Sequence, residues 1–356
     1  MSVGIQIPLV AALGTLTGHW LPFVLAPAAL TIAFLSSMFG GRSVWGEPSP
    51  VQLYGVLWPF FAWWTVALLF ALLAPVLLGL AHFSSLTRDV ALILGVALAT
   101  LGAAGAVWQR PRLRTRDIHI VGLPEAFEGF RVAQISDLHC GPFASGARVA
   151  GWVSQVNRLR PDLIAVTGDL IANGEKFVPV VAAELGKLRA PSGVFASMGN
   201  HDYFTDGEAL ATAIEEAGLT MLRNRGVEVS HGDGRIFVAG VDDTWTRRQD
   251  FDRALADRPA GMPTLLLAHD PALFPEAAAR GVDLTLSGHT HGGQLALPFF
   301  ARKLNLARLI TRFTTGFYRV GDASLYVNRG LGTTGPPVRV GVRPEIGLLT
   351  LRRVRA

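Results

Sequence analysis

The sequence has little cysteine and, over its first third, almost no charge. Cys140 is the only cysteine among 356 residues, which excludes an internal disulfide and a cluster of thiolate metal ligands. Residues 1–109 contain four formally charged side chains, which are Arg42, Glu47, Arg88 and Asp89. No Lys or Arg precedes the first apolar run, which argues against a cleaved signal peptide. The later charge density is that of an ordinary globular domain, so we place a domain boundary near residue 110.

Three long runs without Asp, Glu, Lys or Arg occupy this first region. They cover residues 5–38, 53–82 and 90–108. A membrane-spanning helix needs about 20 apolar residues, so each run is long enough to span a bilayer. The first run is long for one helix and short for two, and residues 18–22 are a candidate break. We therefore expect three or four transmembrane helices, with a buried soluble helical bundle as the alternative.

The overall charge indicates an anionic partner. The formal net charge is +5, the isoelectric point is about 9.9 and the mean hydropathy is +0.36. Phospholipid head groups or a phosphorylated substrate suit such a chain. No stripe of Lys and Arg interleaved with aromatic residues supports a nucleic-acid partner.

A basic cluster directly after the last apolar run predicts the orientation. It consists of Arg110, Arg112, Arg114 and Arg116. By the positive-inside rule, the domain that follows lies in the cytoplasm. We expect a multi-pass protein of the inner membrane with a cytoplasmic catalytic domain.

Beyond residue 110, apolar strand candidates repeatedly end in side chains that bind metals. These strands cover residues 130–135, 162–166, 194–198, 264–268 and 284–287. The side chains that follow them are Asp137, His139, Asp169, Asn200, His269, His289 and His291. Open α/β sheets build their sites at the carboxyl ends of strands. Seven nitrogen and oxygen ligands at successive strand ends predict a two-metal site, whose ions lie about 3.5–4 Å apart and act on phosphorus.

The same residues form five motifs in a fixed order. They are Asp137-Leu138-His139, Gly168-Asp169, Gly199-Asn200-His201-Asp202, His269 and Gly288-His289-Thr290-His291. Over residues 117 to 351, approximately, the chain resembles the calcineurin-like metallophosphoesterase superfamily. Within this superfamily the chain is most similar to the bacterial membrane-associated subgroup, in which the last motif extends to Gly-Gly-Gln as it does here. That subgroup includes enzymes similar to the UDP-2,3-diacylglucosamine hydrolase. The resemblance implies an α/β fold, in which transmembrane helices (residues 1–110) precede a four-layer αββα domain (residues 111–356) of two packed mixed sheets flanked by helices.

The resemblance also implies a role for each residue. Asp137, His139 and His291 would bind one metal, Asn200, His269 and His289 would bind the other, and Asp169 would bridge them. His201 would stabilise the phosphoryl oxygens or protonate the leaving group. Asp202 would orient the ring of His201. Two divalent ions are implied, and this donor set does not choose among Mn, Fe, Zn and Co. Ala172 stands where the family often has an acid, so we expect altered support for the site.

These observations predict a membrane-anchored phosphoesterase that hydrolyses a phosphodiester or pyrophosphate bond. The expected substrate is lipid-linked, such as UDP-2,3-diacylglucosamine, with membrane lipids as neighbours and the oligomeric state open. The alternatives are a phosphomonoesterase or phosphoprotein phosphatase, and a non-catalytic receptor or scaffold.

Residues 298–319 are expected to form an amphipathic helix. Its apolar face would carry Leu306, Leu309, Ile310, Phe313 and Phe317. Such a helix either packs on the core or lies on the membrane surface and guides an acyl-bearing substrate.

Overall fold

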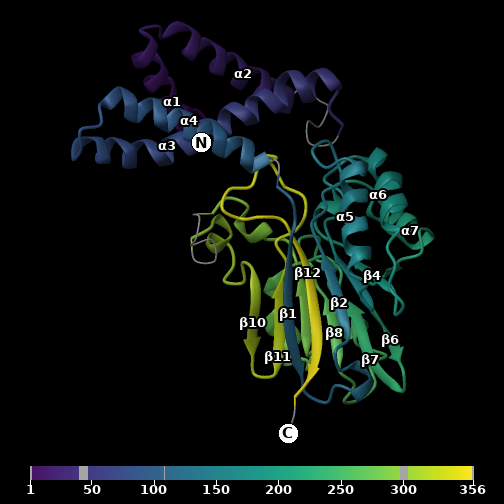
Figure 1. The fold of residues 1–356 in the computed structure, drawn as a ribbon. Helices are drawn as coiled ribbons and strands as arrows, with labels where there is room; N and C mark the ends of the chain where they lie inside the picture. The colour runs from purple at the N-terminus through teal and green to yellow at the C-terminus, as the bar shows by residue number, and fades with distance from the viewer. Residues whose placement is uncertain (1, 40–46, 108, 297–303, 355–356) are drawn as a thin grey trace. The chain divides into compact units, whose positions relative to one another are not determined.

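The computed structural model describes residues 2–39, 47–107, 109–296 and 304–354. It divides into two compact units (Figure 1). One comprises residues 1–109 and 335–338, and the other comprises residues 110–334 and 339–356.

The first unit is helical. Its helices are α1 (Ser2–Thr17), α2 (Leu21–Phe39), α3 (Trp58–His82) and α4 (Arg88–Val107). A π-helical turn, Gln52–Leu57, leads directly into α3. Residues 18–20 break the first apolar run as expected, and Gly18 adopts a φ of 72° there. Three segments, Leu21–Met38, Gln52–His82 and Arg88–Val107, are long and apolar enough to cross a membrane, whereas Val3–Thr17 is shorter.

Small residues let α3 and α4 pack closely. Ala91, Gly95, Ala99 and Ala103 repeat every four residues along the buried face of α4. A Cβ atom on Gly95 would lie 2.9 Å from the ring of Phe70 in α3, so glycine permits this approach. Small residues at this spacing are typical of helix pairs in membranes, where close packing replaces the hydrophobic effect between helices.

The second unit contains two six-stranded mixed sheets. In spatial order the first comprises β1 (Arg112–Ile120), β12 (Glu345–Arg353), β2 (Arg131–Ile135), β3 (Leu163–Thr167), β4 (Val194–Ser197) and β5 (Thr220–Met221). The second comprises β10 (Gly316–Val320), β11 (Ala323–Val327), β9 (Leu284–Ser287), β8 (Thr264–Leu267), β7 (Gly234–Gly240) and β6 (Arg225–His231). β12 runs parallel to β1 and antiparallel to β2.

Helices cover the outer faces of the packed sheets. Alternate strand residues such as Val132 and Leu265 fill the core between the sheets. The other face of the first sheet packs on α5 (Gly146–Arg158), α6 (Val178–Leu185) and α7 (Gly207–Glu216) (Figure 1). The other face of the second sheet packs on α8 (Phe251–Ala254) and α9 (Phe274–Ala279). The expected α/β fold with two packed mixed sheets is confirmed.

The two sheets are joined by hydrogen bonds close to their parallel strand ends. Nε2 of Gln134, in β2, donates to the carbonyl oxygen of Ser287, in β9, at 3.0 Å. Nδ2 of Asn328 donates to the carbonyl oxygen of Gln134 at 3.2 Å. These buried bonds hold the ends of β2 and β9 together, so the loops that follow both strands meet.

The expected helix over residues 298–319 is wrong. Residues 297–303 lie outside the described residues, Leu306–Leu309 is a single 3₁₀ turn, and Phe317 belongs to β10. The hydroxyl of Tyr318 accepts hydrogen bonds from the backbone N–H groups of residues 314 and 315, which a helix would have used internally. Phe313 is buried against Phe274, with 5.6 Å between ring centroids. The helical spacing of apolar residues therefore serves a turn, a core contact and a strand.

Candidate metal centre

Five candidate ligands have left-handed backbone conformations. Their φ angles are 51° for Asp137, 45° for His139, 53° for Asp169, 68° for His289 and 51° for His291. Residues other than glycine rarely adopt this backbone conformation, because their Cβ atom crowds the backbone. Such strain persists where surrounding structure enforces it, and it is concentrated at functional sites. Here each turn follows a strand and directs its side chain toward the same point.

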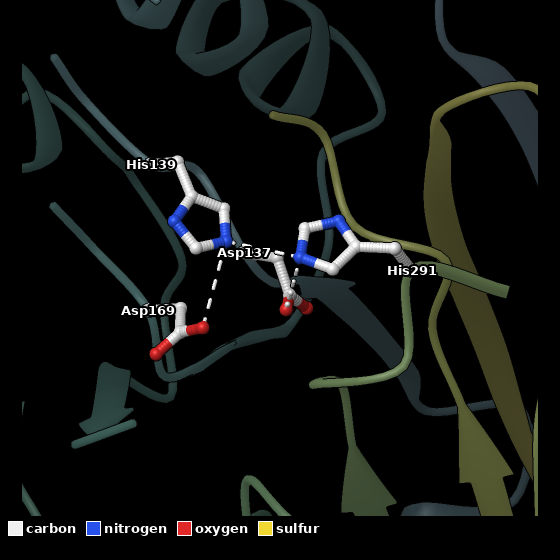
Figure 2. Close-up of side chains that lie close together, drawn as sticks. All are labelled: Asp137, His139, Asp169 and His291. Atoms are coloured by element: carbon white, nitrogen blue, oxygen red, sulfur yellow. Dashed lines mark hydrogen bonds and ion pairs between the residues drawn. The ribbon is translucent and has the colours of Figure 1, made fainter. Parts of the chain in front are cut away.

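The first ligand group brings four buried side chains together. Asp137, His139, Asp169 and His291 converge from three loops (Figure 2). Nε2 of His139 lies 3.0 Å from Nε2 of His291 and 3.5 Å from Oδ2 of Asp169. Nε2 of His291 also lies 3.3 Å from Oδ1 of Asp137.

The second ligand group shares one residue with the first. Asp169 also belongs to a cluster with His269 and His289. Nε2 of His269 lies 3.3 Å from Oδ2 of Asp169. Nδ1 of His289 lies 3.0 Å from Oδ1 of Asn200, which adds an amide oxygen to this group. The structure thus brings all seven predicted ligands together, with Asp169 between two groups.

The spacing of the donor atoms fits metal binding. Two ligands about 2.1 Å from one ion lie about 3.0 Å apart at an octahedral angle and about 3.4 Å apart at a tetrahedral angle. The donor pairs above are 3.0–3.5 Å apart. Nε2 of His269 is buried, and none of the described residues, Asp169 at 3.3 Å included, meets it in hydrogen-bond geometry. This cluster of Asp and His residues is suited to binding metal ions.

Glycines make room for the ligands. A Cβ atom on Gly199 would collide with Oδ1 of Asp169 and lie 2.9 Å from Nε2 of His269. A Cβ atom on Gly288 would collide with Oδ2 of Asp137. The glycines of these two motifs therefore meet a steric demand of the site.

The charges of the site depend on one another. Burial raises the pKa of Asp169, but interactions with His269, His139 and His201 together outweigh burial and hold this pKa well below its usual range. Burial lowers the pKa of His269, but Asp169, Asp137 and the carbonyl oxygen of Thr167 together outweigh burial and hold this pKa well above its usual range. Burial raises the pKa of Asp137 to about 6 and lowers that of His139 to about 3, so His139 is neutral near pH 7.

Comparison with known proteins agrees with this geometry. Residues 130–293 match the family model of the calcineurin-like phosphoesterase. The uncharacterized metallophosphoesterase YkuE of Bacillus subtilis (strain 168) is 34% identical over 274 residues, which cover 74% of this chain and 94% of that protein. The chain belongs to the calcineurin-like phosphoesterase family. Its members are hydrolases of phosphoric esters, so family membership identifies the chain as a phosphoesterase.

Two vertebrate relatives are named as transmembrane proteins. The transmembrane protein with metallophosphoesterase domain is 34% identical in Danio rerio and 31% identical in Bos taurus. The matches cover 74% and 75% of this chain but only 62% and 63% of those proteins. Together with the long apolar helices, these names support membrane association of this phosphoesterase.

His201 and Asp202 reach the centre, but their relation differs from the expectation. The carboxylate of Asp202 accepts hydrogen bonds from the backbone N–H groups of Gly199, Leu170 and Ile171, at 2.7–3.1 Å. The ring of His201 is held instead by the carbonyl oxygen of Ala172, 3.0 Å from Nδ1. Asp202 therefore fixes the two motif loops, because its lone pairs are used by backbone donors. The position where this phosphoesterase lacks the family acid supports His201 through its backbone.

Arg339 supports the centre and was missed from the sequence. Its buried guanidinium donates to the carbonyl oxygens of His291 (3.3 Å), Gly330 (3.2 Å) and Gly332 (3.1 Å). Gly330 in turn packs against the Cβ of Asp137. A charged residue between Val338 and Val340 was the available signal, because a buried arginine needs several acceptors.

A second missed pair lies beside His201. Nε2 of Gln294 donates to the carbonyl oxygen of Thr334 at 2.9 Å, and the N–H of Thr334 donates to Oε1 of Gln294 at 3.0 Å. Oγ1 of Thr334 is then 3.4 Å from Nε2 of His201. The Gln at the end of the extended motif thus positions a hydroxyl at the candidate catalytic imidazole.

Proposed function

We propose that the chain is a membrane-anchored, dinuclear-metal phosphoesterase that hydrolyses a phosphodiester or pyrophosphate bond of a lipid-linked substrate. The observation that carries the proposal is the position of Asp169 in two ligand groups at once. One carboxylate shared in this way suits a bridge between two ions. Two divalent cations, drawn from Mn, Fe, Zn and Co, would polarise the phosphoryl group and activate water.

The chain's own groups define the proton chemistry at the leaving group. The carbonyl oxygen of Ala172 can only accept, so Nδ1 of His201 carries a hydrogen. In a neutral ring Nε2 is then a bare acceptor, beside the hydroxyl of Thr334. His201 can donate from Nε2 only after taking up a second proton. We propose that this imidazolium contacts the phosphoryl oxygens and returns its proton to the leaving oxygen.

An exposed apolar tip supports a lipid-linked substrate. Leu304, Leu306, Leu309 and Ile310 form this tip, and the last two are 85% and 84% exposed. Arg308 lies among them. An apolar surface with a basic residue suits contact with the acyl and phosphate parts of anionic lipid.

The segment that carries the tip packs against the loop that contains His289 and His291. Oγ1 of Thr290, between His289 and His291, donates to the carbonyl oxygen of Thr314 at 2.7 Å. Asn305 pairs with Ala296 and would meet a Cβ atom on Gly293 at 2.7 Å. A lipid held at the tip would therefore lie on a segment that packs against the loop of His289 and His291.

The location proposed for this enzyme is the inner membrane, with several spans and the catalytic domain in the cytoplasm. The long apolar helices support several spans, and the basic cluster of residues 110–116 supports the orientation. A C-terminal reporter should be active only in its cytoplasmic form, and activity only of a periplasmic reporter would reverse the orientation.

The function is tested with the purified full-length chain in detergent, with Mn²⁺ and UDP-2,3-diacylglucosamine. We expect release of UMP and lipid phosphate, and loss of this release in Asp169→Asn. Intact lipid substrate beside cleavage of bis(p-nitrophenyl) phosphate would keep the diesterase and remove the lipid assignment. Faster cleavage of p-nitrophenyl phosphate than of the diester would favour a phosphomonoesterase, and no cleavage of any substrate would favour a receptor or scaffold.

The tip is tested by Leu309→Asp with Ile310→Asp. Turnover of the lipid substrate should fall at least tenfold, while turnover of bis(p-nitrophenyl) phosphate stays within twofold, because the water-soluble diester does not use the tip. Val121→Asp is the matched control, since Val121 is also an exposed apolar residue. Phe313 is unsuitable for this test because it is buried. Equal turnover of the lipid by the double variant and the wild type would remove the tip from the proposal.

A further inference from the structure

Two exposed aromatic side chains stand beside the metal centre. Trp245 is 64% exposed, and its ring centroid lies 5.7 Å from that of His289. Phe204 is 53% exposed, and its ring centroid lies 4.5 Å from that of His201. The two rings thus adjoin different parts of the centre, because His289 belongs to the second ligand group and His201 packs on His139 of the first.

The backbone that carries Trp245 is fixed although its ring is exposed. The N–H of Thr246 donates to Oδ2 of Asp243 at 2.8 Å, and the N–H of Arg248 donates to the carbonyl oxygen of Asp243 at 3.0 Å. Oγ1 of Thr244 donates to Oδ2 of Asp270 at 3.0 Å. A large aromatic ring that a braced loop holds in water beside a candidate metal ligand is available to stack on a ligand.

We propose that these rings bind the two substituents of the phosphodiester, Trp245 stacking on a planar ring of the group that stays on phosphorus and Phe204 contacting the leaving group. This inference rests on the proposed function. His201 is the group placed to return a proton to the leaving oxygen, so the leaving group lies on the side of Phe204. The retained group is then directed toward His289 and Trp245. The face of an indole suits a nucleobase or another aromatic ring.

The reaction is balanced by water alone. A water oxygen forms a new bond to phosphorus, and the bond from phosphorus to the leaving oxygen breaks. The leaving oxygen takes the proton from Nε2 of His201, and a proton from the attacking water restores it. The product that keeps phosphorus is a monoester of the group bound by Trp245.

The test uses two diesters that have the same charge and the same leaving group. They are bis(p-nitrophenyl) phosphate, with an aromatic retained group, and methyl p-nitrophenyl phosphate, with an aliphatic one. In the full chain with Mn²⁺, Trp245→Ala should lower kcat/KM about tenfold more for the aromatic diester than for the methyl diester. Trp245→Phe should recover most of this preference. Phe204→Ala should lower both efficiencies by similar factors, because the leaving group is common to both.

The outcomes separate this inference from the function on which it rests. Gln249→Ala alters an exposed side chain of the same loop and should change the preference less than twofold. An equal loss on both diesters in Trp245→Ala, in a variant that melts like wild type, would overturn the role of Trp245. A larger loss on the aromatic diester in Phe204→Ala would reverse the two assignments. Absence of Mn²⁺-dependent cleavage of either diester by wild type would instead refute the proposed function, and this inference with it.

Discussion

Replacing Arg339 by methionine should destabilise the catalytic unit and weaken its metal site together. Burial lowers the pKa of Arg339 to about 10, so the guanidinium remains charged at neutral pH. It donates to the carbonyl oxygens of three loop residues, His291, Gly330 and Gly332. His291 is itself a candidate metal ligand, and Gly330 packs against Asp137, which is another.

The size of the effect follows from the acceptors left behind. Each buried carbonyl that loses its donor costs about 1–3 kcal/mol, and removal of a buried charge offsets part of this sum. A net loss of about 3 kcal/mol or more in the free energy of unfolding is expected. For a domain of roughly 150–250 residues, this loss corresponds to a decrease in Tm of about 6–12 °C. Arg339→Lys should be intermediate, because one ammonium cannot span the acceptors of a planar fork.

The assay is thermal unfolding in detergent, with and without Mn²⁺, combined with titration of Mn²⁺. Arg343→Met is the matched control, since Arg343 is exposed and lies four residues further along the chain. Its effect should stay within about 0.5 kcal/mol, as for most surface substitutions. A Tm of Arg339→Met within 2 °C of the control would refute the reasoning. An unchanged Mn²⁺ affinity beside the expected loss of Tm would limit the role of Arg339 to folding.

Three further predictions concern the centre itself. As the pH is raised toward 6, affinity for Mn²⁺ should increase at least about tenfold per pH unit, because a proton on Asp137, whose pKa is about 6, competes with the ion. Equal affinities at pH 5 and pH 6 would contradict this. Gly199→Ala should abolish Mn²⁺ binding in calorimetry, since its Cβ meets Asp169, whereas Gly151→Ala on open helix surface should not. Gln294→Leu should lower kcat about tenfold with little change in Mn²⁺ affinity, because it releases Thr334 from His201; parallel loss of both would show that Gln294 supports the ligands instead.

Much of the site could be predicted from the sequence because its ligands follow short apolar strands. The strand ends predicted that Asp137, Asp169 and His269 lie close together, and the structure brings them together, since parallel strands bring their carboxyl ends to one edge. The break near Gly18 was predicted from a similar local signal, whereas the two packed sheets were expected from the family resemblance. Such signals are local, and each is readable within a few residues.

The remaining features depend on contacts between distant segments. Arg339 is recognised only when its three carbonyl partners are brought around it by the fold. The partner of His201 is a backbone oxygen of Ala172, which no side-chain pattern reveals. Phe313 and Phe317 matched a helical face by spacing, although one fills a core and the other lies in a strand. Leu309 and Ile310, on the same expected face, are exposed, so the helical spacing predicted neither the element nor the burial in this segment.

The pairing of β12 between β1 and β2 has a consequence for biosynthesis. Residues 345–353 are made after every other strand described above, yet they occupy an interior position of the first sheet. Pairing across nearly the whole domain is slow, because a long loop must close before any contact rewards it. β1, which follows the apolar helices in the sequence, therefore remains unpaired until the ribosome has synthesised β12. The arginines of β1 give the unpaired strand positive charge, which discourages aggregation during this interval.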